Sequence, residues 1–368
     1  MTITMGGRRW GSMARAASAI MIVAFHAVAA WGDVRYTVTD LGTLGGTSSV
    51  ARGINNAGQV VGSADTPSGQ DAFLYSGGAM IDLGTLGYGT SVAQDVNGAG
   101  WVAGYSQTPA VDQHAFLYSG GTMADLGTLG GNRSFALGIN GAGQVVGYSD
   151  TSGYTNAHAF LYAGGAMSDL GTLGGDKSHA FGINDAGQVV GEARIAGNAE
   201  YHVFLYSGGV MTDLGTLGGT VGCARSINNA GWIVGQSYMS GGTDYHAFLY
   251  RDGVMTDLGT FGGDGSVALD INSAGDIVGD ISVNGSTHSA FLYSDGAMSD
   301  LNSLIDPASG WTLSSASAIN DRGQIVGGGY NPEGQSRGYL LTPMPEPASM
   351  GLFAVGVAGL LARRRRGK

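Results

Sequence analysis

The sequence predicts an all-β fold, because one unit of about 44 residues recurs seven times and each copy contains four short strand-like segments. A lone strand-like segment also precedes the first copy. The clearest marker is Asp-Leu-Gly, which becomes Asp-Leu-Asn in the last copy. Its aspartates lie 42 to 44 residues apart, at Asp40, Asp82, Asp125, Asp169, Asp213, Asp257 and Asp300. This regular spacing indicates one array of repeats.

Two further markers share this period. An Ile/Val-Asn-x-Ala/Arg-Gly segment places its asparagine at Asn55, Asn97, Asn140, Asn184, Asn228, Asn272 and Asn320. A run similar to Ala-Phe-Leu-Tyr places an aromatic residue at Phe73, Phe116, Phe160, Phe204, Phe248, Phe291 and Tyr339. Since three independent markers agree on seven copies, the repeat count is seven.

Each copy is expected to form four strands. The first alternates small and larger residues, as in residues 134–140, a pattern typical of a strand in a crowded place. Asn-x-Ala-Gly then supplies a tight turn into Gln-Val-Val-Gly. The third strand is Ala-Phe-Leu-Tyr-Ser, ended by Gly-Gly or Asp-Gly, and the fourth is Met-x-Asp-Leu-Gly-Thr.

Four antiparallel strands in a repeat of this length are typical of a β-propeller blade. The last copy ends near Thr342 without a fourth strand, whereas residues 36–42 stand alone before the first copy. We therefore expect residues 34–342 to form a seven-bladed β-propeller, closed by the N-terminal strand pairing with the last blade, because closure removes an open sheet edge. An open β-solenoid is the alternative, although its coils are usually shorter and its ends capped.

The units resemble HAF repeats, whose His-Ala-Phe is found here at residues 114–116, 158–160 and 246–248. This resemblance implies an extracellular repeat protein and covers residues 40–341. The first copy has Asp71 in place of histidine, the fourth has Val203 in place of alanine, and the last two copies also depart from the motif. The histidine is therefore not expected to be essential to every unit.

Residues 1–30 are predicted to be a secretory signal peptide. Arginines in the first 15 residues precede an apolar run over residues 16–29, which ends in a small-x-small cleavage site at Ala27 and Ala29. The run is short for a membrane-spanning helix. An uncleaved anchor is the alternative.

Residues 343–368 are predicted to direct sorting. Pro345, Glu346 and Pro347 precede an apolar stretch over residues 348–362, and a basic stop follows at Arg363, Arg364, Arg365 and Arg366. Positive charge after a short apolar segment indicates transient membrane association with the body outside. The three parts together resemble the PEP-CTERM sorting signal of Gram-negative bacteria. That resemblance implies recognition and cleavage by an exosortase, and release to the cell surface or matrix. An ordinary single-pass anchor is the alternative.

The charge and cysteine content exclude several classes of protein. Between its ends the chain carries nine basic and 28 acidic residues, a net charge of −19, so nucleic acid is not an expected partner. The single cysteine, Cys223, excludes a disulfide framework and any multi-cysteine zinc site. We expect Cys223 to be a buried small residue.

Repeated polar residues are expected to serve the fold. The histidines His114, His158, His202 and His246 share one repeat position and are expected to make hydrogen bonds at strand ends, although a ring of metal ligands is the alternative. The Asp-Leu-Gly aspartates are expected to cap turns, with a calcium-binding carboxylate ring as the alternative. No calcium loop or nucleotide loop motif is present, so no metal or cofactor is predicted and a calcium requirement stays open. His179, outside that ring, is kept as a candidate functional residue.

The variable segments between the second and third strands are the expected binding surface. They include residues 148–157, 192–201, 236–245 and 280–287. Tyrosine combines an apolar ring with a polar tip and suits sugars or protein surfaces. The candidate ligand face therefore consists of Tyr154, Tyr201, Tyr238, Tyr245 and Tyr330. The alternative is that these rings only cover blade edges.

The sequence contains no recognisable catalytic constellation, so no catalytic residue is assigned. We expect a secreted, surface-sorted and non-enzymatic binding or scaffolding module of the cell envelope, exopolysaccharide or biofilm matrix. Its expected partners are the exosortase during sorting and an exopolysaccharide or envelope protein afterwards. The alternative is a carbohydrate-active enzyme with an acidic pair in the variable loops, such as Asp112 and Asp150.

Overall fold

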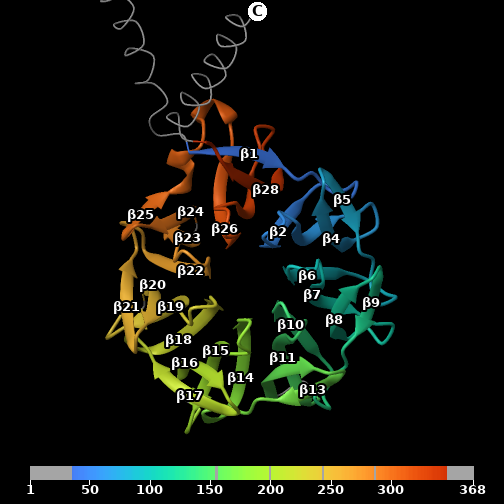
Figure 1. Ribbon diagram of the computed structural model, residues 1–368, viewed down its shortest axis with the longest axis vertical. Coiled ribbons are helices and arrows are strands. Elements are labelled where there is room, and N and C mark those ends of the chain that lie inside the picture. Colours follow the sequence, from blue (N-terminus) through green and yellow to red (C-terminus); the bar gives the residue numbers. More distant parts are fainter. Residues whose placement is uncertain (1–34, 154–155, 199, 243, 286, 346–368) are drawn as a thin grey trace, which may run out of the picture. The chain divides into compact units, whose positions relative to one another are not determined.

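The computed structural model describes residues 35–153, 156–198, 200–242, 244–285 and 287–345. These residues contain 28 β-strands and two short 3-10 turns, η1 (Leu301–Leu304) and η2 (Pro307–Ser309). The strands form seven four-stranded antiparallel units around a common centre (Figure 1). Five units are separate sheets, whereas units 4 and 5 are joined into one eight-stranded sheet by a single parallel pairing of Tyr201 with Val221. The all-β prediction is confirmed, and the arrangement is propeller-like.

Units 1 to 7 follow chain order, and each begins with an inner strand near the centre of Figure 1. The inner strands are β2 (Ser49–Ile54), β6 (Ser91–Val96), β10 (Ser134–Ile139), β14 (Gly174–Ile183), β18 (Gly218–Ile227), β22 (Gly265–Ile271) and β26 (Thr312–Ile319). The second strands are β3 (Val60–Asp65), β7 (Val102–Gln107), β11 (Val145–Ser152), β15 (Val189–Ile195), β19 (Ile233–Met239), β23 (Ile277–Val283) and β27 (Ile325–Tyr330).

The third strands are β4 (Gln70–Ser76), β8 (Gln113–Ser119), β12 (Asn156–Ala163), β16 (Tyr201–Ser207), β20 (Tyr245–Arg251), β24 (Thr287–Ser294) and β28 (Ser336–Pro343). The outer strands are β5 (Ala79–Asp82), β9 (Thr122–Asp125), β13 (Ala166–Asp169), β17 (Val210–Gly215), β21 (Val254–Gly259), β25 (Ala297–Asp300) and, in unit 7, β1 (Tyr36–Asp40).

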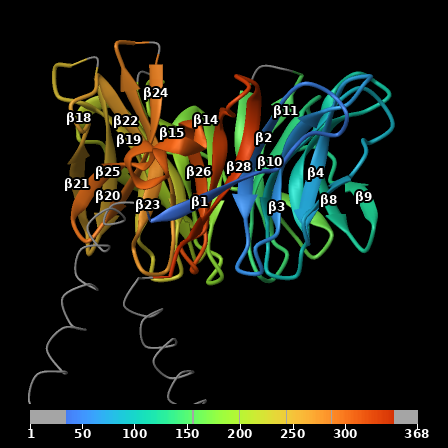
Figure 2. The same cartoon turned by 90° about the horizontal axis from the view of Figure 1, so that it is seen from above.

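The strand ends define two faces, which are seen edge-on in Figure 2. We call one the turn face, because it carries the asparagine turns between the inner and second strands. The other is the connection face, which carries the loops between the second and third strands and the links from each unit to the next.

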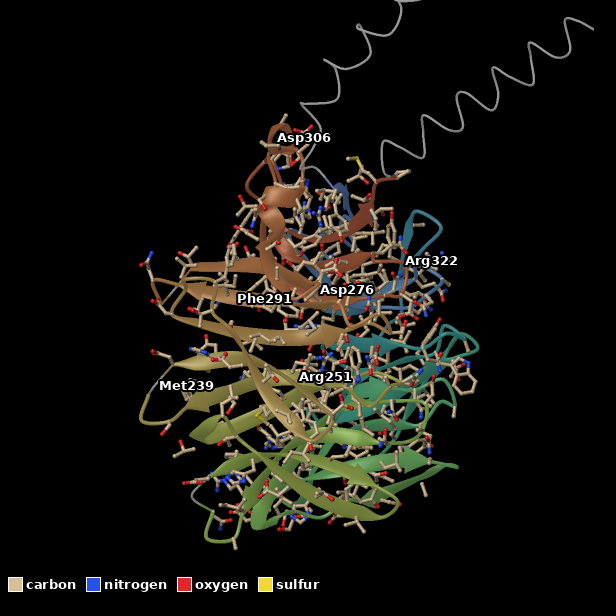
Figure 3. The ribbon with its side chains drawn as sticks, turned by 60° about the vertical axis from the view of Figure 1, so that its left-hand side comes forward. Met239, Arg251, Asp276, Phe291, Asp306 and Arg322 are labelled. Carbon is tan, nitrogen blue, oxygen red and sulfur yellow. The ribbon has the colours of Figure 1, made fainter. Side chains whose placement is uncertain are left out.

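The core of each unit is an aromatic ring packed over a glycine. Phe116 in β8 is fully buried, and its Cα partner in β7 is Gly104. A Cβ atom at Gly104 would lie 2.8 Å from the Phe116 ring, so this position requires glycine. The same ring is fully buried in every unit, as Phe73, Phe160, Phe204, Phe248, Phe291 (Figure 3) and Tyr339. The aromatic marker therefore recurs in the sequence because each unit needs the same buried ring in its core.

Apolar side chains also hold the units together. At the junction of units 1 and 2, Val61 and Ala72 pack in one buried cluster with Val102 and Phe116. An equivalent cluster occupies each of the other six junctions. Because every unit buries apolar surface on both sides, a unit at an open end would leave one of these clusters exposed.

A ring of asparagines closes the inner end of the turn face. In each turn the asparagine side chain accepts two backbone N–H groups, as Asn55 Oδ1 does from Ala57 and Gln59 at 3.0 Å. Its Nδ2 donates to the backbone oxygen of the next asparagine, with N to O distances of 2.9 to 3.4 Å. Asn320 of unit 7 donates to Asn55 of unit 1 at 3.0 Å, so the ring is complete. The asparagine marker seen in the sequence therefore recurs because each copy supplies one member of this ring.

The N-terminal strand completes unit 7, as predicted. Strand β1 pairs antiparallel with β28, from Tyr36 opposite Pro343 to Asp40 opposite Tyr339. The backbone N–H of Leu41 also bonds to the Gly338 oxygen at 3.0 Å. The described part of the chain thus closes on itself through strand pairing as well as through the asparagine ring.

Two local predictions need correction. The second and third strands extend further than expected, so the segments between them shrink to residues 153–155, 196–200, 240–244 and 284–286. The link after Asp300 also contains η1 and η2, which the degenerate Asp-Leu-Asn did not reveal. Asp300 caps η1 by accepting the Asn302 N–H, so the aspartate keeps its capping role although the connection is longer.

The asparagine ring generates a stability prediction. Asn140 is 3% exposed, and replacing it with alanine removes the donor to Asn184 and the acceptor for two backbone N–H groups. We expect Asn140→Ala to lower the free energy of unfolding by about 2 to 4 kcal/mol, because buried polar groups lose their partners. Chemical denaturation measures the change. Asn132→Ala is the control, and an equal loss in both variants would contradict the assigned role of the ring.

Candidate functional site

The repeated histidines and aspartates bond to each other within single units. Nδ1 of His114 lies 2.8 Å from Asp125, and His158, His202 and His246 have the same partner position at 2.8 to 2.9 Å. The aspartate also accepts a backbone N–H two residues later, as Asp125 does from Gly127 at 2.8 Å. The predicted hydrogen-bonding and turn-capping roles are confirmed. Most of the repeated polar side chains are therefore occupied by the framework.

Unit 1 breaks this pattern. Asp71 replaces the histidine and lies in the third strand, two residues before Phe73, whose Cα partner in the outer strand is Asp82. Burial, with a smaller contribution from the Asp82 charge, raises the pKa of Asp71. The substitution places two carboxylates where four other units have a hydrogen-bonded His–Asp pair, so this position tolerates loss of the pair.

An aromatic crescent lies at the connection-face side of units 2 to 4. We define it as Tyr105, Phe135, Tyr148, His179 and Tyr201. Successive ring centroids lie 5.0, 4.8, 4.6 and 6.4 Å apart, and every member is partly exposed. The rings come from β7, β10, β11, β14 and β16, so strands rather than loops hold them in place.

Charged groups border the crescent at unit 4. His179 Nδ1 lies 2.9 Å from Glu192 Oε1, and the Arg194 guanidinium lies over the Tyr201 ring at 4.9 Å. Arg194 also bonds to Asp176 at 3.2 Å. Burial raises the pKa of Tyr201, so its hydroxyl stays protonated and can donate a hydrogen bond. The arrangement offers flat apolar faces beside polar groups, the chemistry that suits a sugar ring.

The crescent does not follow the repeat. Units 1, 6 and 7 place Val50, Val267 and Ser315 where units 3 and 4 have Phe135 and His179. His179, kept as a candidate from the sequence, is one of its five rings, between Tyr148 and Tyr201. Sequence reasoning named Tyr201 as well but missed Tyr105, Phe135 and Tyr148, although comparing the copies position by position would have shown them. Cys223 occupies the same position in unit 5 and is 1% exposed, so its predicted burial is confirmed.

The centre of the molecule is a polar channel. A cavity of about 380 Å³ on the turn-face side is lined by the asparagine turns, and a deeper one of about 140 Å³ is lined by the inner strands. Asp95 and Asp270 line both cavities. Five copies of the unit have glycine, serine or alanine at this position, so the two aspartates are also exceptions to the repeat.

Both channel aspartates bind to the next unit. Asp95 accepts the N–H of Val96 at 2.7 Å and that of Ile139 in unit 3 at 3.0 Å. Asp270 accepts the Ser226 hydroxyl at 2.7 Å and the Ile319 N–H of unit 7 at 2.9 Å. Burial raises the pKa of Asp95, and burial raises the pKa of Asp270 to about 6.

The predicted tyrosines do not form one cluster. Tyr201 and Tyr245 begin third strands, and Tyr238 and Tyr330 lie at the ends of second strands, so the expectation that they lie in loops is wrong. Tyr238 and Tyr245 face each other in unit 5 with ring centroids 6.2 Å apart. Tyr330 in unit 7 is 52% exposed. Only Tyr201 joins the crescent, and Tyr154 lies outside the described residues.

Asp112 and Asp150, the acidic pair expected in the variable loops for a carbohydrate-active enzyme, do not both lie in loops. Asp150 lies in β11 rather than in a loop, is 3% exposed, and forms an ion pair with Arg133 at 2.9 Å. Asp112 precedes β8 in unit 2. A general acid must be able to exchange a proton with substrate, so the buried ion pair of Asp150 is unsuited to that role.

The predicted processing segments lie almost entirely outside the described residues. Pro345 is described, whereas Glu346, Pro347, the basic stop Arg363 to Arg366, and the cleavage residues Ala27 and Ala29 are not. In the part of the chain that is described, no helix has the length and apolar character to cross a membrane. The signal peptide over residues 1–30 stays a prediction.

Comparison with known sequences identifies the C-terminal segment. Residues 345–366 match the family described as the PEP-CTERM protein-sorting motif. This motif is that of secreted proteins sorted to the cell surface and implies processing by exosortase, in agreement with the predicted tail. No curated protein sequence matches the chain.

Solved structures similar to this chain include propeller proteins of low sequence identity. TolB from Acinetobacter baumannii has a TM-score of 0.43 and 12% identity over 66% of this chain, which spans 63% of that protein's length. AofleA from Arthrobotrys oligospora, as a mutant, has a TM-score of 0.39 and 10% identity, over 72% of this chain and 88% of its own. Aleuria aurantia lectin, with bound Fucalpha1-6GlcNAc, has a TM-score of 0.38 and 11% identity, over 69% of this chain and 94% of its own.

The channel generates a prediction about pH. Burial raises the pKa of Asp270 and of Asp280 in unit 6 from 3.8 to about 6. A carboxyl whose pKa is higher in the folded than in the unfolded chain binds its proton more tightly in the folded state. It therefore destabilises the fold once the pH rises above its pKa in the unfolded chain. Each group should therefore lower the free energy of unfolding by roughly 3 kcal/mol between pH 4 and 7.

Asp270→Asn removes this titration, so the free energy of unfolding of the variant should fall less than that of the wild type between pH 4 and 7. Urea denaturation across this range measures both slopes. Asp295→Asn, at an exposed hairpin turn, is the control and should keep the wild-type slope. A variant Asp270→Asn with the wild-type slope would show that Asp270 is ionised in the folded protein without cost.

Proposed function

We propose that residues 34–342 form a seven-bladed β-propeller that acts at the cell surface as a non-enzymatic binding module for exopolysaccharide or another component of the envelope or matrix. The observation that carries this proposal is the aromatic crescent, a partly exposed series of rings that the repeat does not require. A residue shared by all copies serves the common fold, whereas a cluster confined to units 2 to 4 has no such explanation.

Sugar binding suits the chemistry of the crescent. Pyranose rings present C–H groups that pack on aromatic faces, and their hydroxyls need donors and acceptors at the edge. Tyr105, Tyr148 and Tyr201 supply both ring faces and hydroxyl groups, and Glu192 and Arg194 add charged partners. Strand positions keep the rings in place before binding, which reduces the entropy lost when a ligand is fixed.

Sorting supports a surface role. The PEP-CTERM match at residues 345–366 follows directly after β28, the strand that closes the ring. We infer that the signal peptide is removed on export and that exosortase then cuts near Pro345, Glu346 and Pro347, so the folded body is released from its short membrane segment. Scaffolding in the matrix is compatible with this route, because a rigid closed body survives outside the cell without disulfides.

The binding proposal predicts a loss on removal of the crescent rings. Tyr201→Ala should weaken binding of the producer's own exopolysaccharide by about fivefold, since one aromatic contact contributes about 1 kcal/mol. The double variant Tyr105→Ala with Tyr201→Ala should weaken binding further. Microscale thermophoresis or calorimetry measures the affinity, with and without calcium.

Trp101→Ala and Tyr245→Ala are matched controls. Trp101 is an exposed ring at the asparagine turn on the opposite face, and Tyr245 pairs with Tyr238 outside the crescent. Neither should change the affinity. Loss of binding in Tyr245→Ala alone would move the site to unit 5, and unchanged binding in the double crescent variant would contradict the proposed site.

Processing gives a separate prediction. Intact-mass analysis of the secreted protein should find a chain that lacks both residues 1–30 and the segment after the Pro-Glu-Pro motif. Replacement of Pro345, Glu346 and Pro347 by alanine should leave the Arg-rich tail attached. Secreted wild-type protein with an intact tail would contradict cleavage at this motif.

A further inference from the structure

Two arginines in the central channel form no ion pair within the described part of the chain. Arg52 of β2 and Arg225 of β18 both line the deeper cavity of about 140 Å³. The same repeat position holds Gln94, Leu137, Phe181, Leu269 and Ser317 in the other units, so the repeat does not require arginine there. The two guanidinium groups therefore need their own explanation.

Neither guanidinium forms an ion pair within the described part of the chain, although the charge of Arg225 acts on Asp280 of unit 6 and partly offsets the rise in the pKa of that carboxyl. The Nε atom of each is buried and has no hydrogen-bond partner among the described residues. The arginine ion pairs of the described chain are those of Arg133, Arg194 and Arg337, all outside this cavity. The Arg225 guanidinium lies over an aromatic face, 4.7 Å from the Phe181 ring centroid.

The two carboxylates that line this cavity already accept hydrogen bonds. Asp95 and Asp270 line the same cavity, but each uses both oxygens to accept hydrogen bonds from the inner strands. They hold neighbouring units together instead of pairing with Arg52 or Arg225. In a body with 28 acidic residues, two half-buried arginines that form no ion pair are unusual, because long-range attraction favours carboxylate partners for them.

The chemistry of the unpaired groups defines what would fit. A guanidinium stays charged at any physiological pH and offers N–H donors in a planar fork that matches carboxylate and phosphate oxygens. Stacking on Phe181 holds the plane of Arg225 while its N–H edge remains available. The cavity has room for roughly five water molecules, enough for one small anionic group.

We propose that the channel binds a small oxyanion, a carboxylate or phosphate group, between Arg52 and Arg225. This site shares no residue with the crescent but adjoins it, because the Phe181 ring lies 6.4 Å from that of His179. It goes beyond the proposed function because it assigns a second ligand to the molecule. Exopolysaccharide binding at the crescent does not depend on it.

Calorimetric titration of the full chain with inorganic phosphate, acetate and glucuronate in an anion-poor Tris buffer tests the proposal. One saturable site per chain is expected for at least one of these probes. Arg52→Gln and Arg225→Gln should each weaken it by about tenfold, because each removes a charged donor fork. Arg225→Lys, which keeps the charge but loses the fork, should fall between wild type and Arg225→Gln.

Thermal unfolding separates loss of binding from loss of fold. The probe that binds should raise the Tm of the wild type and leave that of the double variant Arg52→Gln with Arg225→Gln unchanged. The unliganded double variant should unfold at about the same temperature as the wild type, since neither half-buried arginine forms an ion pair within the described part of the chain. Arg322→Gln is the control at an exposed turn (Figure 3) and should bind as wild type does.

Absence of any heat and any Tm shift with all three probes at millimolar concentration would overturn the proposal. Binding that persists in the double variant would overturn it as well. If glucuronate alone binds, and polygalacturonate of equal residue concentration does not, the ligand is a free anion. Stronger binding of the polymer would assign the site to a charged group on a chain.

Discussion

The structure depends on closure of the ring. Each unit buries an apolar cluster on both of its sides, so an array with two ends would expose the clusters at its termini. Pairing of β1 with β28 removes these ends at the outer edge, and the hydrogen bond from Asn320 to Asn55 removes them at the centre. Closure also explains why the chain places a lone strand before the first repeat and omits one after the last.

The residues that repeat in most copies serve the fold. The asparagines join the turns, the phenylalanines fill the space above the second-strand glycines, and the histidines bond to the outer-strand aspartates. Each of these roles is completed within one unit or between two neighbours. What remains for recognition is the set of positions at which the copies differ. The aromatic crescent in units 2 to 4 and the arginines of the channel are both such exceptions, and strands hold the residues of both.

Much of the fold could be predicted because the determinants are local and repeated. Period-two alternation, the asparagine turn and the unmatched first strand correctly gave the strands and the closure. The candidate site was harder, since it depends on which side chains from different units meet. Tyr201 was identified for its position near a loop, yet the crescent residues Tyr148 and Tyr105 lie one and two units away along the ring. Asp150 appeared available for chemistry, but its ion pair with Arg133 is visible only once β10 and β11 are aligned.

A crystal structure of the secreted protein with an oligosaccharide from the producer's exopolysaccharide tests the central claim most directly. We expect a ring of seven four-stranded blades closed by β1, with a sugar ring stacked on the rings of the crescent. A different number of blades, or a sugar bound to the turn face with the crescent empty, would contradict it.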